Sequence, residues 1–169
     1  MLTVDGWVLA ESVEGDIDTL MPWFPDAASL KIWGGPDFRH PYNRHSFAED
    51  MHWGRMASFS LRHSGPELAA FGQLYEKFNC IHLARLVVSP ALRGQGVGKR
   101  LVGMLLAVGP QLFPCRKFSL FVNRENTPAY ECYKSMGFVA TDYPDNVPLA
   151  DVCDYLTRPL SNLETSHAS

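Results

Sequence analysis

A glycine-rich run in the middle of the chain constrains the fold more than any other feature. The sequence SPALRGQGVGKR, residues 89–100, lies between the apolar run IHLARLVV and an apolar segment with helical spacing. A strand, a glycine turn and a helix in this order leave backbone N–H groups at the helix start without intrahelical partners, and an anion can bind there. The run therefore predicts either a phosphate-binding loop or a turn that needs glycine only for its backbone angles.

The glycine spacing argues against two common nucleotide motifs. A P-loop reads GxxxxGK followed by Ser or Thr, and here Arg93 replaces the first glycine and Arg100 the hydroxyl residue. The dinucleotide motif GxGxxG fails because Lys99 stands where the third glycine belongs. ATP and NAD are therefore not the predicted ligands.

The rest of the chain alternates between strand and helix patterns. We expect strands at 6–12, 55–62, 67–75, 80–88, 117–122, 138–143 and 151–157. We expect two short helices between residues 16 and 33 with a bend at Pro22 and Pro25, and a third helix near 46–53 after a loop at 34–45. Longer helices should run from Val97 to a stop at Gly109-Pro110 and from Thr127-Pro128 to Gly137. These elements predict an α/β (α+β) fold, in which helices flank a mixed sheet with an antiparallel meander.

Length and charge narrow the class of protein. The 169 residues fit a single domain, expected over 1–160, with a flexible polar tail at 161–169. No apolar stretch approaches the ~20 residues that span a bilayer, and the N-terminus lacks the pattern of a signal peptide. A cytoplasmic protein with no membrane partner is expected. The net charge of −3 argues against a nucleic-acid partner.

The cysteine and histidine spacing predicts no metal site. The four cysteines are widely separated and form no CxxC pair, so we interpret them as free thiols, mostly buried. His40 and His45 lie in one loop, but no third ligand has a suitable spacing.

Two elements together resemble a known family. RGQGVG resembles the pyrophosphate-binding signature Gln/Arg-x-x-Gly-x-Gly/Ala of the GNAT superfamily of N-acetyltransferases. Downstream, NTPAYECYKSMGF is similar to the family's Asn-x-x-Ala-x-x-x-Tyr-x-x-x-Gly-Phe element. The matching positions are Arg93, Gly96 and Gly98 in the first element, and Asn126, Ala129, Tyr133, Gly137 and Phe138 in the second. The resemblance covers residues 67–138.

The resemblance implies acetyl-CoA as co-substrate. It would lie where two parallel strands, 80–88 and 117–122, splay apart in a GNAT-like, mostly antiparallel sheet. Backbone N–H groups of the loop would bind its pyrophosphate, and a backbone N–H near Val88 would polarise the thioester carbonyl. The predicted cofactor-binding residues are Leu86, Val87, Val88, Arg93, Gly94, Gln95, Gly96, Val97, Gly98, Lys99 and Asn126. Asn126 is equally suited to cap the next helix.

Tyr133 and His82 are the predicted catalytic residues. A phenol is protonated at neutral pH and can protonate the departing coenzyme A thiolate, although Tyr133 also lies on one helix face with Ala129 and Met136, as a packing residue would. Family members often carry a base glutamate on the strand before the loop, where this chain offers His82, with Glu76 in the preceding turn. A lone strand histidine is commonly structural, so the base stays open.

The predicted activity is acetyl transfer from acetyl-CoA to a primary amine, either a small molecule or a protein N-terminus, by direct attack in a ternary complex. Cys132 adjoins Tyr133 in sequence but points about 100° away on a helix, which disfavours a covalent acetyl-cysteine route. The alternative is a non-catalytic acyl-CoA-binding sensor or interaction module. The four tryptophans, all within residues 7–53, either line the acceptor pocket or form core. Monomer and homodimer fit the sequence equally.

Overall fold

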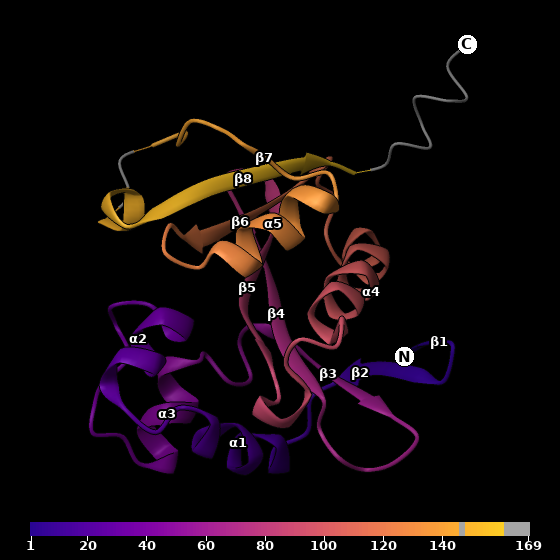
Figure 1. The fold of residues 1–169 in the computed structure, drawn as a ribbon, viewed down its shortest axis with the longest axis vertical. Coiled ribbons are helices and arrows are strands. Elements are labelled where there is room, and N and C mark those ends of the chain that lie inside the picture. The colour runs from indigo at the N-terminus through magenta and orange to yellow at the C-terminus, as the bar shows by residue number, and fades with distance from the viewer. Residues whose placement is uncertain (146–147, 161–169) are drawn as a thin grey trace. The chain divides into compact units, whose positions relative to one another are not determined.

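The computed structural model describes residues 1–145 and 148–160, so the predicted tail at 161–169 lies outside the described residues, as do residues 146–147 between the last two predicted strands. Eight strands form a sheet in the order β1-β2-β3-β4-β5-β6-β8-β7 (Figure 1). The strands are β1 Leu2–Val4, β2 Trp7–Glu11, β3 Ala57–His63, β4 Ala70–Lys77, β5 Cys80–Val88, β6 Lys117–Asn123, β7 Val139–Ala140 and β8 Cys153–Pro159. The helices are α1 Gly15–Leu20, α2 Ala27–Gly34, α3 Arg44–Asp50, α4 Val97–Leu112 and α5 Thr127–Ser135, with short 3₁₀ turns η1 Met21–Trp23, η2 Pro90–Leu92 and η3 Pro148–Asp151.

The predicted fold class is confirmed. β5 and β6 pair in parallel, whereas the pairs β1–β2, β2–β3, β3–β4, β6–β8 and β7–β8 are antiparallel. The chain divides into two compact units. The first unit holds Met1–Leu74 and Arg85–Met104, and the second holds Tyr75–Ala84 and the described residues from 105 onward. Each unit is described separately.

The first unit begins with a hairpin that the sequence prediction missed. The strand expected at 6–12 is confirmed as β2, but it pairs with β1 from Leu2↔Leu9 to Val4↔Trp7. Asp5 and Gly6 form the turn with φ of 52° and 81°, the left-handed angles that a two-residue hairpin turn requires.

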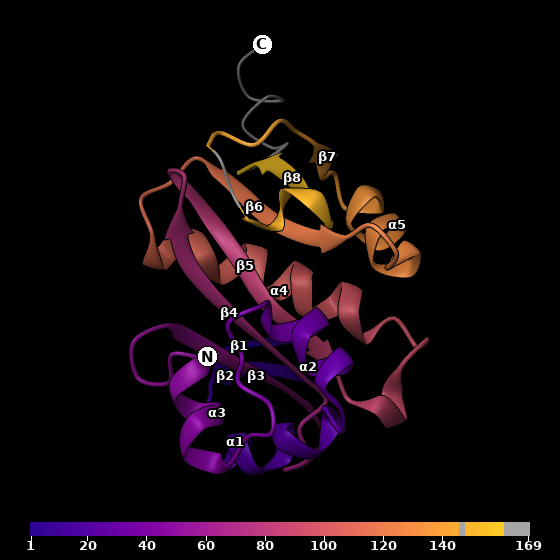
Figure 2. The same cartoon turned by 90° about the vertical axis from the view of Figure 1, so that its left-hand side faces the viewer.

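The three short helices of the first unit form where proline and capping residues predict them. Pro22 lies in η1, which separates α1 from α2, and α1, α2 and α3 group together in Figure 1 and Figure 2. Asp26 caps α2 by accepting the Ser29 N–H at 2.7 Å. Their apolar faces pack against Leu68 and against Phe71 of β4 in a buried core of Ile17, Leu20, Phe24, Leu30, Phe47, Met51, Leu68 and Phe71.

The second unit corrects the predicted end of one helix. α4 continues through Pro110 to Leu112, although a proline inside a helix has no N–H to donate to the carbonyl four residues earlier. Gly109 does not stop the helix and instead allows close packing. A Cβ built at Gly109 would lie 3.2 Å from Ile81 and 3.3 Å from Phe118.

The C-terminal strands of the second unit differ in length from the prediction. β8 pairs with β6 along seven residues, from Lys117↔Pro159 to Asn123↔Cys153. β7 comprises only Val139 and Ala140 of the expected 138–143, and Tyr143 instead bonds through its hydroxyl to the Cys153 carbonyl.

Candidate functional site

The glycine loop of the first unit has the backbone geometry of an anion-binding turn. Residues 93–96 form an exposed turn between η2 and α4. Gly94 and Gly96 have φ of +76° and +79°, and no described atom lies within 4 Å of a Cβ built on either. The Gly96 carbonyl accepts the Arg100 N–H at 3.2 Å, so the N–H groups of the first turn of α4 are not used inside the helix. The first turn of α4 carries no acidic residue.

The basic residues of the loop have different surroundings. Arg93 and Lys99 are exposed. Arg100 is directed to the N-terminal hairpin instead, where its guanidinium lies 3.7 Å from the Asp5 carboxylate and 5.4 Å from the centre of the Trp7 ring. Positive charge beside the loop therefore comes from Arg93 and Lys99.

The strand before the loop changes character along its length. Cys80–Leu83 of β5 are buried, whereas Ala84–Val88 are half-buried. Val88 faces α4, with its Cγ2 3.5 Å from a Cβ built on Gly98. Val87 packs against the core under the three short helices. The half-buried segment Leu86–Val88 includes the residues predicted to contact the pantetheine arm.

Tyr133 lies in α5 of the second unit. Asn126 caps this helix by accepting the Ala129 N–H at 3.4 Å, which confirms its capping role, and its predicted contact with the cofactor stays a prediction. Tyr133 is half-buried, with its ring 6.2 Å from that of Phe138. Burial raises the pKa of the phenol above its ordinary value, and the Cys132 thiol adds to the shift. The phenol therefore holds its proton throughout the physiological pH range.

His82 is buried in the second unit among polar and aromatic groups. It is 1% exposed, and its Nδ1 lies 2.8 Å from the Ser119 hydroxyl. The rings of Tyr75 and Phe121 lie 5.1 and 4.6 Å from the imidazole. This environment suits a structural histidine, and the predicted role as base stays a prediction. Glu76 is exposed and belongs to β4, not to the turn that the sequence suggested.

The tryptophans have different surroundings. Trp33 stacks on Phe24 at 4.2 Å and on Phe47 at 5.7 Å, and Trp23 and Trp53 also pack against this core. Trp7 does not belong to this core, and its ring stacks on that of His63 with the ring centres 4.5 Å apart. The core interpretation therefore fits at least three of the four.

The sequence analysis did not single out Arg85 or Gln73. Arg85 has φ of +49° inside β5, and its guanidinium donates to the Gln73 amide oxygen at 3.0 Å. A non-glycine residue with positive φ inside a strand is uncommon and often marks a functional region. No local pattern signals such an angle, so only the structure reveals it.

Residues 1–145 and 148–160 contain no group of three His, Cys, Asp or Glu side chains placed to hold a metal ion. Over the same residues, no helix has the length and apolarity needed to cross a bilayer.

Comparisons with known proteins define the family. The Acetyltransferase (GNAT) family matches residues 27–138. The chain belongs to this family, and its enzyme class, acetyl-CoA-dependent N-acetyltransferase, follows from that membership.

Individual proteins are also similar to this chain. It is 42% identical over 60 residues to the peptidyl-lysine N-acetyltransferase YjaB of Salmonella typhimurium, a match that spans 36% of this chain and 37% of the relative. A spermidine N-acetyltransferase from Vibrio cholerae, in complex with CoA and spermine, superposes with a TM-score of 0.70 at 16% identity over 93% of this chain and 97% of that one. The ribosomal-protein-S18-alanine N-acetyltransferase of Escherichia coli superposes with a TM-score of 0.62 at 21% identity, over 92% and 94% of the two chains. At these identities the structural likeness shows a shared fold.

Proposed function

We propose that this chain transfers an acetyl group from acetyl-CoA directly to a primary amine within a ternary complex. The observation that supports this most is the strand–glycine loop–helix unit, β5 to α4, with Gly94 and Gly96 in left-handed conformations. Acetyl-CoA supplies the activated acetyl group. Every further step is assigned to residues of this chain.

The loop and the start of α4 fit the pyrophosphate of acetyl-CoA. Left-handed glycines turn successive N–H groups toward one side, and the N-terminus of a helix adds partial positive charge. Arg93 and Lys99 contribute full charges at the rim of the loop. A glutamate at position 96 would add both a negative charge and a Cβ where φ is +79°.

The backbone of Leu86–Val88 is assigned to the pantetheine arm. The ladder between β5 and β6 runs only from Ile81 to Leu83, so a second extended chain can form backbone hydrogen bonds with the part of β5 beyond it. An N–H near Val88 would then stabilise negative charge on the thioester oxygen as the amine attacks.

Tyr133 is assigned to protonate the leaving thiolate. A general acid must be protonated before the reaction, and burial raises the pKa of this phenol. Cys132 is assigned no covalent role.

His82 is the candidate base for deprotonation of the amine, and its 1% exposure fits a structural role equally. An aliphatic amine has a pKa of about 10.4 and is mostly charged at neutral pH, so it must lose a proton before it attacks. The contact between His82 Nδ1 and the Ser119 hydroxyl fixes the orientation of the ring.

The acceptor class is a primary amine. The named relatives acetylate a peptidyl lysine, spermidine and an alanine of ribosomal protein S18, according to their names. All three acceptors carry an amino group. This supports an amine as the acceptor of this chain and does not favour one of the three.

The Tyr133→Phe variant tests the proposal. We expect unchanged binding of acetyl-CoA, measured by calorimetry, and a fall in kcat for coenzyme A release of about a hundredfold or more, since the general acid is lost. Tyr130→Phe, on the same helix, is the matched control and should retain full activity. Equal kcat values for wild type and Tyr133→Phe would remove Tyr133 from the mechanism. Binding without any thiol release by the wild type would favour the acyl-CoA-binding module.

A further inference from the structure

Four basic residues lie at one end of the strands in the second unit. β4 ends at Lys77, a two-residue turn leads into β5, and β5 and β6 start side by side in parallel. β8 runs in the opposite direction, and its last residue, Pro159, pairs with Lys117. Arg116 extends this ladder, because its carbonyl accepts the Leu160 N–H at 3.0 Å. These strand ends carry Lys77, Arg116, Lys117 and Arg158, which we call the basic edge.

The guanidinium of Arg158 has no acceptor in residues 1–145 and 148–160. Its Nε is buried without a hydrogen-bond partner there, although the side chain as a whole is only half-buried. The side chain lies across Gly137, where a built Cβ would be 3.2 Å from Nε, and the φ of +92° favours glycine at that position. A buried donor without an acceptor costs free energy, so packing alone does not explain why an arginine lies here.

The four side chains of the basic edge surround the strand ends from both faces of the sheet. Side chains alternate along a strand, so Arg116 and Arg158 project from one face at diagonal positions of the β6–β8 ladder. Diagonal neighbours are about 7–8 Å apart, close enough for two guanidinium groups to share one anion. Lys77 and Lys117 lie on the other face, where the Lys77 ammonium is 6.0 Å from the centre of the Phe121 ring. Arg116 and Lys117 are exposed.

Little negative charge accompanies the basic edge. In the segments 75–80, 115–118 and 157–160, which form these strand ends, Glu76 is the only acidic residue. Its carboxylate acts on the Cys115 thiol, whose pKa is raised by burial and raised further by Glu76. The whole chain has a net charge of −3, so an excess of positive charge at this place does not follow from composition.

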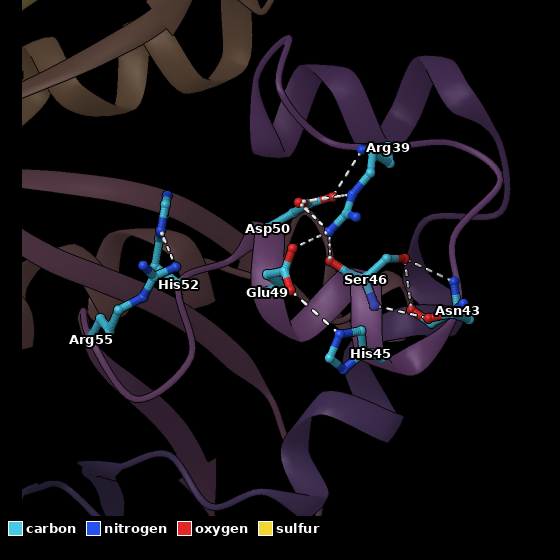
Figure 3. Close-up of polar contacts among 8 residues, drawn as sticks. All are labelled: Arg39, Asn43, His45, Ser46, Glu49, Asp50, His52 and Arg55. Carbon is cyan, nitrogen blue, oxygen red and sulfur yellow. Dashed lines mark hydrogen bonds and ion pairs between the residues drawn. The ribbon is translucent and has the colours of Figure 1, made fainter.

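Arginines elsewhere in the chain have described partners. Arg39 bonds to Asp50 and to Glu49, each at 2.9 Å (Figure 3). The Arg55 guanidinium lies 3.2 Å from His52 Nδ1 (Figure 3), and the pKa of His52 is lowered by burial and further by the charges of Arg85 and Arg55. Three further arginines pair with the carboxylates of Asp18, Asp16 and Asp154, namely Arg44, Arg62 and Arg124. The basic edge differs from these pairs because its described surroundings supply no carboxylate to Arg116 or Arg158.

We propose that the basic edge is a docking surface for a short acidic segment of a partner protein. Neighbouring strands are about 4.8 Å apart, so the ends of β4, β5, β6 and β8 span about 14 Å, the length of about four extended residues. Carboxylates of such a segment can pair with the guanidinium groups of Arg116 and Arg158 through parallel hydrogen bonds. A long nucleic acid fits less well, because the net charge of −3 repels a polyanion beyond the basic edge.

Two labelled peptides, hexaglutamate and hexaglutamine, test the docking surface by fluorescence anisotropy. We expect the wild type to bind hexaglutamate with a Kd on the order of 0.1 mM at low salt, because exposed ion pairs are individually weak. Hexaglutamine should bind at least about fivefold more weakly. Added salt should reduce the difference, since it screens charges at the surface.

Variants locate the binding on the molecule. Arg116→Gln combined with Arg158→Gln should weaken hexaglutamate binding at least about fivefold. The matched control combines Arg39→Gln with Arg44→Gln, which changes the net charge equally but removes arginines that are already paired with carboxylates, and it should bind as the wild type does. Because Arg116 is exposed, Arg116→Gln alone replaces the double variant if circular dichroism shows that the latter does not fold, and it should weaken binding about twofold.

Three results would overturn the inference. The first is equal binding of the two peptides by the wild type, and the second is an unchanged affinity for hexaglutamate when the arginines of the basic edge are replaced. The third is tighter binding of a labelled hexauridylate than of hexaglutamate, which would assign the basic edge to nucleic acid. None of these measurements involves acetyl-CoA, so the inference can fail while the proposed function holds.

Discussion

The two units each contain a cluster of aromatic rings, and the clusters differ in the ionisable group they surround. The first cluster consists of Phe24, Trp33, Phe38, Phe47 and Phe71, with ring centres 4.2 to 6.3 Å apart. The second consists of Tyr75, His82, Phe121, Tyr143 and Tyr155, with ring centres 4.6 to 5.9 Å apart. The first borders the guanidinium of Arg85, whereas the second contains an imidazole and phenols and has the Lys77 ammonium 6.0 Å from the centre of the Phe121 ring.

This difference separates two kinds of chemistry. A guanidinium beside rings is always charged and attracts an anion. In the second cluster, burial raises the pKa of Tyr155 to about 12, so the phenol remains neutral in the physiological pH range. His82 adds one hydrogen-bonding contact, with the Ser119 hydroxyl, and its ring lies beside those of Tyr75 and Phe121. Ring packing alone therefore does not define a function. The polar or ionisable group beside the rings decides which chemistry each cluster can support.

The largest expected effect comes from breaking the first cluster at its centre. Phe47 is 0% exposed, and its ring contacts those of Phe24, Trp33, Phe38 and Tyr42. We expect Phe47→Ala to lower the free energy of unfolding by about 3–5 kcal/mol in urea titrations, because it leaves a cavity. Phe47→Leu should cost clearly less. A loss under about 1 kcal/mol for the alanine variant would mean that the first cluster is loosely packed.

An intermediate effect is expected from the polar pair of the second cluster. If His82 deprotonates the amine, His82→Gln lowers kcat by about a hundredfold at pH 7. Ser119→Ala leaves one buried partner unsatisfied, which should cost about 1–3 kcal/mol of stability with kcat largely retained. Activity is normalised to folded enzyme by circular dichroism. An unchanged kcat in His82→Gln would assign this histidine to structure alone.

The smallest expected effect concerns His52, beside the first cluster. Because its pKa is lowered in the folded chain, the unfolded chain takes up this proton first as the pH falls below about 6.5. The folded chain therefore loses stability from about pH 7 down to the lowered pKa. His52→Asn tolerates the φ of +57° and should reduce the loss of stability between pH 7 and pH 5.5 in urea titrations. An identical pH dependence of stability in the two proteins would show that folding does not lower the pKa of His52.

Much of the fold follows from local sequence patterns. β5 was predicted at its observed bounds, and the bend at Pro22, the start of α4 at Val97 and the end of α5 before Gly137 all appear where expected. These features depend on period, proline and glycine, which act over a few residues. The glycine loop could be predicted for the same reason, because a loop that binds an anion through its backbone N–H groups needs glycines at particular positions within a few residues.

The missing features depend on residues distant in sequence. The φ of +49° at Arg85 is linked to Trp33, 52 positions earlier, and the orientation of its guanidinium depends on Gln73 and Ser58. The helix α4 continues past Gly109, and this glycine packs closely against Ile81 and Phe118, which are distant in sequence. Such tertiary contacts override local propensity, and no window of sequence contains them.

The most direct test of the central claim is calorimetric titration with acetyl-CoA. The account predicts micromolar binding by the wild type and a loss of about a hundredfold or more in Gly96→Glu, because a carboxylate would repel the pyrophosphate at a backbone that also disfavours a side chain. Gly65→Glu, in the β3–β4 turn with no described atom within 4 Å of its Cβ, is the matched control and should bind as the wild type does. Equal affinity in Gly96→Glu, or no binding by the wild type, would contradict the assignment of the loop to the pyrophosphate of acetyl-CoA.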